Sequence, residues 1–221
     1  MKSQQTELTW REGRVPVSTR FDDPYFNLDN GLAETRHVFL NGNGLPDRFK
    51  PGFQIAELGF GTGLNFLTTV LCWDQSGQDG TFTFTSFEAF PMRAEDMAHA
   101  LAAFPELTEP AQELLEQTAQ PEIRVGGGIL RIIEGDARRT LPAWAGRADA
   151  WFLDGFSPAK NPELWEPTLL QAVADHSSPG ATAATYSAAG HVRRALEAAG
   201  FAVTRSSGFG RKRHMVQAVL P

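Results

Sequence analysis

Three alternating glycines, at positions 59, 61 and 63, follow directly on an apolar segment that ends in Glu57-Leu58. Glycines this close together are costly in conformational entropy, so they indicate a tight turn in which the main chain approaches a ligand. The stretch over residues 64–74 then has the length and pattern of a helix. The sequence therefore predicts a strand over 53–58 that turns into a helix whose first N–H groups face a ligand. A tight turn without a ligand is the alternative.

The spacing of these glycines argues against a dinucleotide site, which needs the pattern Gly-x-Gly-x-x-Gly. The third glycine of that pattern would fall on Leu64 or Phe66. The order acidic-x-Gly-x-Gly-x-Gly instead resembles the first motif of the class I S-adenosylmethionine-dependent methyltransferases. The resemblance implies S-adenosylmethionine as the cofactor. The cofactor-binding residues that we predict in this segment are Glu57, Gly59, Phe60, Gly61, Gly63 and Asn65.

The composition is that of an ordinary globular protein. The chain has 221 residues, of which 42% are hydrophobic and 21% charged, enough for one generous domain or two small ones. Cys72 is the single cysteine and the five histidines lack ligand spacing, so we expect neither a disulfide nor a bound metal. The polar start of the chain and the lack of an apolar run of about 18 residues predict a cytoplasmic protein without a membrane segment.

Strand and helix patterns alternate from residue 53 onward, which is typical of a mainly parallel sheet with helices on both faces. Two strand patterns follow each other directly near the C-terminus, so one strand there should be antiparallel. The predicted fold is α/β, of the Rossmann-like class I methyltransferase type with seven strands. The predicted strands cover residues 53–58, 81–88, 129–133, 148–153, 181–186, 201–205 and 215–220, with 123–125 as a hairpin arm. We place this S-adenosylmethionine-binding domain at residues 51–221 and expect residues 1–50 to form an irregular extension that packs on it.

Acidic residues end two of the predicted strands, where ligands bind in such sheets. Glu88 can accept hydrogen bonds from both ribose hydroxyls of an adenosine, and Phe90 can lie against the adenine. Asp136 can accept from the adenine amino group while a backbone N–H at Ala137 donates to the ring. The alternatives are a surface glutamate for Glu88 and a helix N-cap for Asp136.

Asp154 follows the apolar strand 148–153 and begins a loop of glycine, proline and aromatic residues. In this fold, that place is where the methyl group is transferred. An alkylamine is largely protonated at neutral pH and then has no lone pair to offer, so a carboxylate beside it can take the proton and hold the nitrogen in line. We therefore predict that Asp154 is catalytic. An aspartate that only anchors its loop is the alternative.

A basic turn, Arg211-Lys212-Arg213-His214, joins the last two predicted strands. The formal charge of −6 argues against a surface that binds polyanions everywhere, but it allows such a local basic patch. The turn is a candidate contact for RNA phosphates, and a solvated turn is the alternative.

Nearly the whole chain resembles the tRNA 5-methylaminomethyl-2-thiouridine-forming methyltransferases, in their bifunctional or stand-alone form. The resemblance is carried by residues 21–27, 30–40, the glycine loop, 149–165 and 208–213. It implies methylation of the primary amine of 5-aminomethyl-2-thiouridine at the tRNA wobble position, with Asp154 as the catalytic acidic residue. The implied substrate or tRNA contacts are Tyr25, Phe156, Lys160, Arg211, Lys212 and Arg213.

The bifunctional members of this family continue into a flavin-dependent oxidase that acts first. This chain ends at Pro221 and has no second glycine fingerprint, so we expect no FAD here and place the oxidase in another domain or in a partner enzyme. The connector 104–129 and the alanine-rich segment 182–189 depart from the family pattern. Two other functions stay open: a methyltransferase for another amine or nucleobase, and a catalytically silent RNA-binding module.

Overall fold

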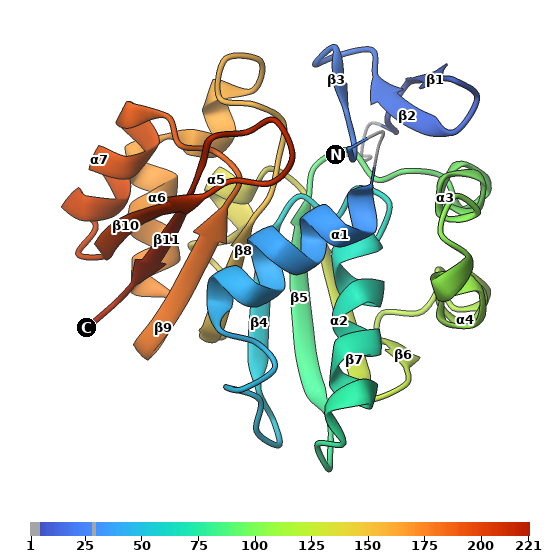
Figure 1. Cartoon of the computed structure of the whole chain (residues 1–221), viewed down its shortest axis with the longest axis horizontal. Helices are drawn as coiled ribbons and strands as arrows, with labels where there is room; N and C mark the ends of the chain where they lie inside the picture. The colour runs from blue at the N-terminus through green and yellow to red at the C-terminus, as the bar shows by residue number, and fades with distance from the viewer. Residues whose placement is uncertain (1–4, 28–29) are drawn as a thin grey trace.

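A mainly parallel sheet forms the centre of the computed structural model, which describes residues 5–27 and 30–221 (Figure 1). Within these residues the sheet has eight strands in the order β10-β11-β9-β8-β4-β5-β7-β6. β7, β5, β4, β8 and β9 pair in parallel, and β11 runs antiparallel to β9 and β10. The strands are β4 Gln54–Leu58, β5 Phe82–Glu88, β6 Ile123–Val125, β7 Gly128–Glu134, β8 Ala148–Leu153, β9 Ser177–Thr185, β10 Ala202–Ser207 and β11 His214–Val219. The predicted seven-stranded fold is confirmed, and the hairpin arm β6 adds one strand at an edge.

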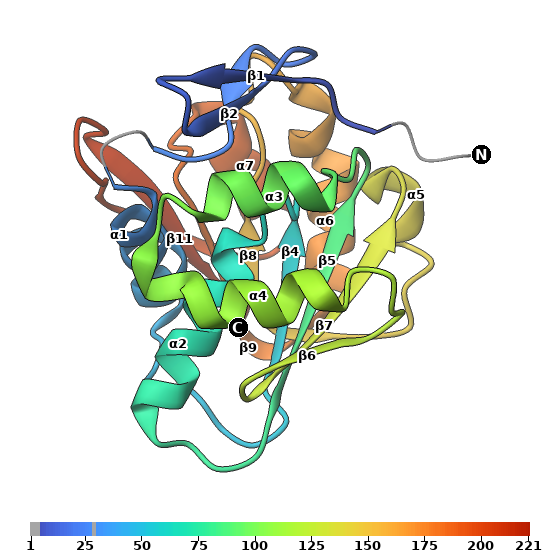
Figure 2. The same ribbon diagram turned by 90° about the vertical axis from the view of Figure 1, so that its right-hand side faces the viewer.

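Helices cover both faces of this sheet (Figures 1 and 2). One face carries α1 Gly31–Thr35, the helical turns η1 Arg36–Leu40 and η2 Asn41–Asn43, α2 Leu64–Ser76, α3 Ala94–Leu101, η3 Pro105–Leu107 and α4 Thr108–Glu116. The other face carries α5 Ala137–Thr140, η4 Pro162–Trp165, α6 Pro167–Asp175 and α7 Gly190–Ala198. None of the described helices is long and apolar enough to cross a membrane.

Side chains of β4 alternate between these two faces, as the pleat of a strand requires. Ile55 packs in the hydrophobic core under α2, whereas Ala56 and Leu58 pack in the core under α6 and α7. Glu57 therefore points toward α2, and it is completely buried there.

Residues 5–27 and 30–50 are more regular than the sequence pattern indicates. β1 Leu8–Arg11, β2 Val15–Ser18 and β3 Asp23–Pro24 form a small antiparallel sheet at the top of Figure 1. Asn30 then caps α1 by accepting a hydrogen bond from the Ala33 amide at 2.8 Å. Phe39 from η1 stacks on Phe152 of the central sheet, with ring centroids 5.4 Å apart. The predicted extension thus packs on the sheet as an ordered layer.

Thr108 is the first residue of α4, and its hydroxyl donates to the Pro105 carbonyl. Asn161 opens the 3-10 turn η4, whereas α6 begins anew at Pro167. β9 begins at Ser177, before the predicted start of this strand at residue 181, and the amide of Gly180 within it donates to the Leu220 carbonyl.

Candidate active site

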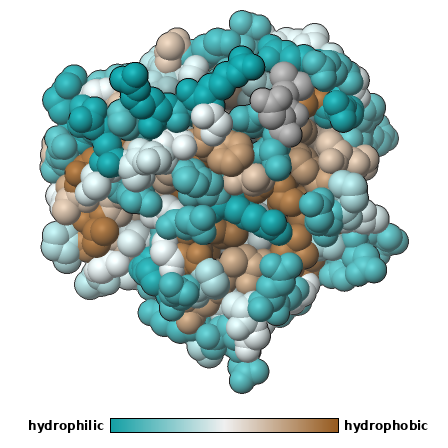
Figure 3. All heavy atoms as spheres, in the orientation of Figure 1, coloured by the Kyte–Doolittle hydropathy of each residue, from teal (hydrophilic) through white to brown (hydrophobic). Residues whose placement is uncertain are grey.

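A cavity of about 940 Å³ lies at the carboxyl ends of β4, β5, β7 and β8. Its volume is that of a site for a small molecule or cofactor. Hydrophilic side chains dominate the face seen in Figure 3, with apolar ones between them around α1 and α2. Most predicted site residues line the cavity: Tyr25, Gly59, Phe60, Gly61, Asn65, Glu88, Phe90, Asp136, Ala137, Asp154, Phe156, Arg211 and Lys212. Glu57, Gly63, Lys160 and Arg213 are outside this lining.

The glycine loop connects β4 to α2 and forms one wall of the cavity. Gly59 has a φ of 89° and Gly61 a φ of 57°, in the left-handed region that favours glycine. A Cβ on Gly59 would lie 2.9 Å from the carbonyl oxygen of Asp154. Glycine is therefore required at position 59, both by the backbone conformation and by the close passage of the Asp154 loop.

Glu88 holds this loop from the neighbouring strand. Its Oε2 accepts from the Gly61 amide at 3.0 Å, and its Oε1 accepts from the Phe90 amide at 2.7 Å. Burial raises the pKa of Glu88, although the hydrogen bonds from main-chain amides act in the opposite direction. The carboxylate lines the cavity and keeps further lone pairs that can accept from hydroxyl groups.

Asn65, in the first turn of α2, joins two carboxyl groups. Its Nδ2 donates to Glu57 Oε1 at 2.8 Å and to Asp154 Oδ2 at 2.7 Å. Its Oδ1 accepts from the Thr35 hydroxyl at 2.9 Å, which fixes the orientation of the amide. We predicted Glu57 and Asn65 as cofactor contacts. Glu57 instead lies beneath the cavity wall, where it also accepts from Ser86 at 2.7 Å and orients Asn65.

Asp154 lies at the end of β8, where the loop that it begins closes the cavity. Its Oδ1 accepts from the Gly155 amide at 2.9 Å. Burial, opposed by the hydrogen bond from Asn65, raises the pKa of Asp154 to about 7, and the negative charge of Glu34 adds to the rise. A carboxyl group with this pKa exchanges a proton near neutral pH, as a general base must.

Glu34 and Tyr186 complete this end of the cavity, and the sequence analysis assigned a role to neither. Lys212 Nζ lies 2.9 Å from Glu34 Oε1 and 4.0 Å from the centroid of the Tyr186 ring. The Tyr186 hydroxyl donates to the Gly155 carbonyl. Burial raises the pKa of Tyr186, and the negative charge of Asp154 contributes. Tyr186 follows the last residue of β9, so the rule that ligands lie beyond strand ends could have identified it.

Aromatic residues of the N-terminal segment border the other end of the cavity. Phe21 stacks on Phe156 at a centroid distance of 4.8 Å and meets Phe90 edge to face at 5.8 Å. The Arg20 guanidinium lies 4.6 Å from the centre of the Phe90 ring. Tyr25 packs edge to face on Phe156 at 5.0 Å, and burial raises its pKa to about 12. Arg20 and Phe21 were not predicted, although the family resemblance includes Phe21.

Lys160 attaches this segment to the Asp154 loop. Its ammonium group binds the Asp22 carbonyl and lies 3.2 Å and 3.6 Å from the carboxylates of Asp22 and Asp23. Asp23 in turn accepts from the Ser157 amide at 2.8 Å. Lys160 is outside the cavity lining and its charge is paired within the protein, so its contact with the substrate stays a prediction.

Asp136 lies two residues after the end of β7 and caps α5, as the N-cap alternative required. Its side chain accepts from the Arg138 amide at 3.0 Å and forms an ion pair with the Arg138 guanidinium at 2.7 Å. The hydrogen bonds from Arg138 lower the pKa of Asp136. Asp136 also lines the cavity, so its contact with adenine stays a prediction.

These residues fit S-adenosylmethionine. Glu88 presents a carboxylate to hydroxyl groups. The acidic side chains of the lining outnumber the basic ones, which suits a cofactor with a positively charged sulfur; the acidic ones are Asp23, Glu34, Glu88, Asp136, Asp154 and Glu163, and the basic ones are Arg20, Arg138, Arg211 and Lys212. Among the described residues, no group of three or more histidine, cysteine or acidic side chains is placed to hold a metal ion.

Comparison with known proteins agrees with this site. A family model described as S-adenosyl-L-methionine-dependent methyltransferase matches residues 101–221. The tRNA 5-methylaminomethyl-2-thiouridine biosynthesis bifunctional protein MnmC of Aeromonas hydrophila is 46% identical over 95% of this chain and 34% of its own length. Its namesake from Caulobacter vibrioides is 45% identical over 97% of this chain and 38% of its own length. The chain thus spans only about a third of these curated relatives.

A solved structure resembles the chain as a whole. The crystal structure of MNMC2 from Aquifex aeolicus matches with a TM-score of 0.78 and 26% identity, over 99% of this chain and 72% of that one. The family match covers more than half of the chain and includes β7, β8 and the Asp154 loop. The chain belongs to the family of S-adenosyl-L-methionine-dependent methyltransferases.

Proposed function

We propose that the chain methylates the primary amine of 5-aminomethyl-2-thiouridine at the tRNA wobble position, giving 5-methylaminomethyl-2-thiouridine. The observation that carries the proposal is Asp154, a carboxyl group in the cavity wall with a pKa of about 7. The names of the Aeromonas, Caulobacter and Aquifex relatives support the choice of substrate.

The proposed role of Asp154 is to take the proton from the substrate ammonium group. An aspartate with an ordinary pKa of about 3.9 is too weak a base for an alkylammonium ion. The raised pKa of Asp154 is closer to that of an alkylammonium ion, so the proton transfer is less unfavourable. Asn65 and the Gly155 amide fix the carboxylate while the proton moves.

The other residues of the site would bind and orient the cofactor and the substrate. Bound S-adenosylmethionine supplies a methyl group that is already activated on a positively charged sulfur. Glu88 and the glycine loop would hold its nucleoside, and Asp136 with the Ala137 amide would recognise its adenine. Phe21, Phe90 and Phe156 would exclude water from the bound group.

The tRNA would approach over the turn between β10 and β11. Arg211 and Arg213 are exposed there, and the cavity opens beside Arg211. The structure modifies our expectation for Lys212, whose ammonium group points into the cavity toward Glu34. Arg211 and Arg213 are therefore the proposed phosphate contacts of this turn.

The proposal extends to the context of the chain. An oxidase that removes a carboxymethyl group would act before this enzyme, either in another domain or as a separate protein, and the site would function in the cytoplasm. Residues 51–221 would form the methyltransferase domain, with residues 1–50 as its cover. A silent RNA-binding module is disfavoured, because Glu88, Asp136 and Asp154 all meet in the cavity.

The proposal is tested by incubating the purified chain with S-adenosylmethionine and two tRNA preparations. One carries 5-aminomethyl-2-thiouridine and the other is its unmodified transcript. We expect nucleoside mass spectrometry to find one added methyl group, on the aminomethyl nucleoside of the first tRNA only. Methylation of a different nucleoside would instead favour the alternative of another nucleobase substrate.

A further inference from the structure

The ammonium group of Lys212 occupies the end of the cavity that Glu34 and Tyr186 form. Lys212 Nζ lies 2.9 Å from Glu34 Oε1 and 4.0 Å from the centre of the Tyr186 ring. The Glu34 side chain is only 13% exposed. A carboxylate and an aromatic face are the two groups that bind an ammonium ion most strongly in a partly desolvated site.

This ammonium group lies in the electrostatic neighbourhood of Asp154. The charges of Glu34 and Lys212 both act on the Asp154 carboxyl, in opposite directions. Tyr186 is joined to the same loop, because its hydroxyl donates to the carbonyl of Gly155. The Lys212 ammonium is therefore near enough to Asp154 for its charge to act on that carboxyl, as the charge of a substrate amine beside Asp154 would.

We propose that Glu34 and the Tyr186 ring form a subsite for the protonated alkylamine of the substrate, and that Lys212 fills this subsite until the substrate amine displaces it. The inference rests on the proposed function, because 5-aminomethyl-2-thiouridine carries such an amine. It makes Glu34 and Tyr186 specificity-determining residues and Lys212 an internal competitor.

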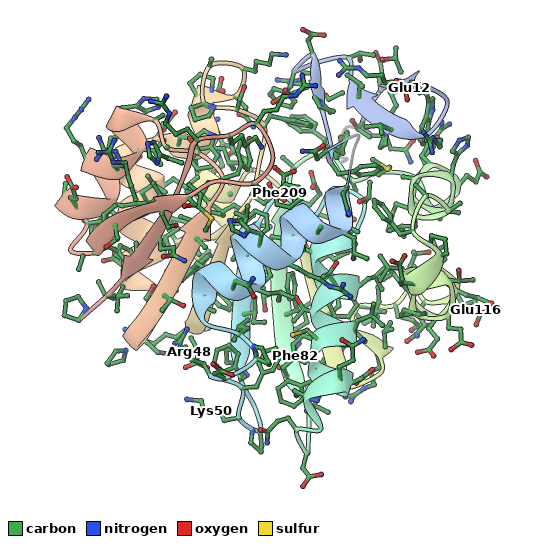
Figure 4. The ribbon with its side chains drawn as sticks, in the orientation of Figure 1. Glu12, Arg48, Lys50, Phe82, Glu116 and Phe209 are labelled. Atoms are coloured by element: carbon green, nitrogen blue, oxygen red, sulfur yellow. The ribbon has the colours of Figure 1, made fainter. Side chains whose placement is uncertain are left out.

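The surroundings of Lys212 allow the exchange. Its side chain is 43% exposed, so it can move away from Glu34 without disrupting the hydrophobic core. In Figure 4, Phe209 marks the loop that carries Lys212, close to α1, which carries Glu34. An empty subsite would leave the nearly buried Glu34 carboxylate without a counter-charge, which is destabilising. Replacing one ammonium by another keeps the charge around Asp154 constant, and the released Lys212 is free to meet an RNA phosphate.

The test measures the Kd of two tRNAs, one with the aminomethyl group and one without it. The preference is the Kd of the tRNA without the group divided by the Kd of the tRNA that carries it. S-adenosylhomocysteine replaces the methyl donor, so that no turnover occurs. In Lys212→Met we expect the preference to rise by about tenfold, because the competing group is gone. In Glu34→Gln and in Tyr186→Leu we expect it to fall by about tenfold, the loss typical of one contact to a charged group. Tyr186→Phe keeps the aromatic face and should keep most of the preference.

Lys50→Met is the matched control, since Lys50 is an exposed lysine that pairs with Asp149 at the opposite end of the strands (Figure 4). If Lys212 were only a phosphate contact, Lys212→Met would weaken the binding of both tRNAs equally. The preference would then be unchanged, and this result would overturn the proposal. An unchanged ratio in Glu34→Gln would overturn it as well. Failure of the proposed function is distinct: the wild-type chain would then show neither a preference nor methyl transfer.

Discussion

Asn65 Nδ2 lies 2.7 Å from Asp154 Oδ2 and makes the Asp154 carboxylate part of a fixed network. The same amide group reaches Glu57, which is buried beneath it. A carboxylate held in this way is oriented before a substrate arrives.

Asn65→Ala removes a hydrogen bond that stabilises the charged form of Asp154. Loss of this bond should raise the pKa of Asp154 above about 7, because the bond from Asn65 now lowers it. We therefore expect the pH at which methyl transfer reaches half of its maximum to move upward. Thr35→Val, which only frees the Asn65 amide to turn, should give a smaller shift in the same direction. The pH profile of kcat measures both, and a midpoint that stays at the wild-type pH in Asn65→Ala would contradict the network.

The raised pKa of Asp154 should also be visible in stability. The unfolded aspartate titrates near pH 3.9, whereas the folded one keeps its proton to about pH 7. Between these values the folded state binds more protons, so the contribution of Asp154 to the free energy of unfolding falls as pH rises. The free energy of unfolding of the wild type, taken relative to that of Asp154→Asn, should fall by about 3 kcal/mol between about pH 5 and pH 8. Urea unfolding of both proteins at each pH measures this difference, and a constant difference would mean that Asp154 titrates normally.

Glu88 should determine the affinity for the nucleoside. Glu88→Ala removes an acceptor for hydroxyl groups and leaves the Gly61 amide without its partner. We expect the affinity for S-adenosylhomocysteine to fall by about 10- to 100-fold, the range for hydrogen bonds to a charged group. Calorimetry measures this loss. Glu116→Ala, on the exposed face of α4, is the control, and the wild type should show no heat with NAD (Figure 4).

Arg211 and Arg213 should contribute charge to tRNA binding without affecting the cofactor. Replacing both with alanine should weaken the binding of the aminomethyl tRNA and of the unmodified tRNA by the same factor. It should also reduce the slope of log K against log salt by about 1.4–1.8, since each neutralised phosphate contributes about 0.7–0.9. The double change of Arg124 and Arg131, which pair with Glu122 at the far edge of the sheet, removes the same charge as a control. An unchanged salt slope would show that the basic turn is merely solvated.

The sequence was sufficient to predict the strand ends that meet at the site. Glu88 is the last residue of β5 and Asp154 directly follows β8, and the carboxyl ends of parallel strands converge on one edge of a sheet. The glycines at 59 and 61 were predictable for a related reason, since a left-handed turn needs them.

Contacts across long stretches of sequence were not predictable in the same way. Lys160 binds Asp22, 138 residues away, and the resemblance that implied a substrate or tRNA contact for Lys160 gave no sign of this partner. The stacking of Phe21 on Phe156 depends on the N-terminal layer, for which the sequence showed no strand pattern. Glu57 is a third case. Side chains alternate along β4, so the Glu57 side chain points toward α2 and lies outside the cavity lining, and its contact with the cofactor stays a prediction.

The central claim is that Asp154 accepts the proton of the substrate amine, and the single-turnover rate of Asp154→Asn tests it most directly. With aminomethyl tRNA and saturating S-adenosylmethionine at neutral pH, we expect the rate to fall by about 10²–10⁴-fold, the usual contribution of a general base. Binding of S-adenosylhomocysteine should persist. Raising the pH should partly restore the variant, because more of the amine is then already neutral. A variant that transfers methyl groups at nearly the wild-type rate at neutral pH would contradict the account and leave Asp154 as an anchor of its loop.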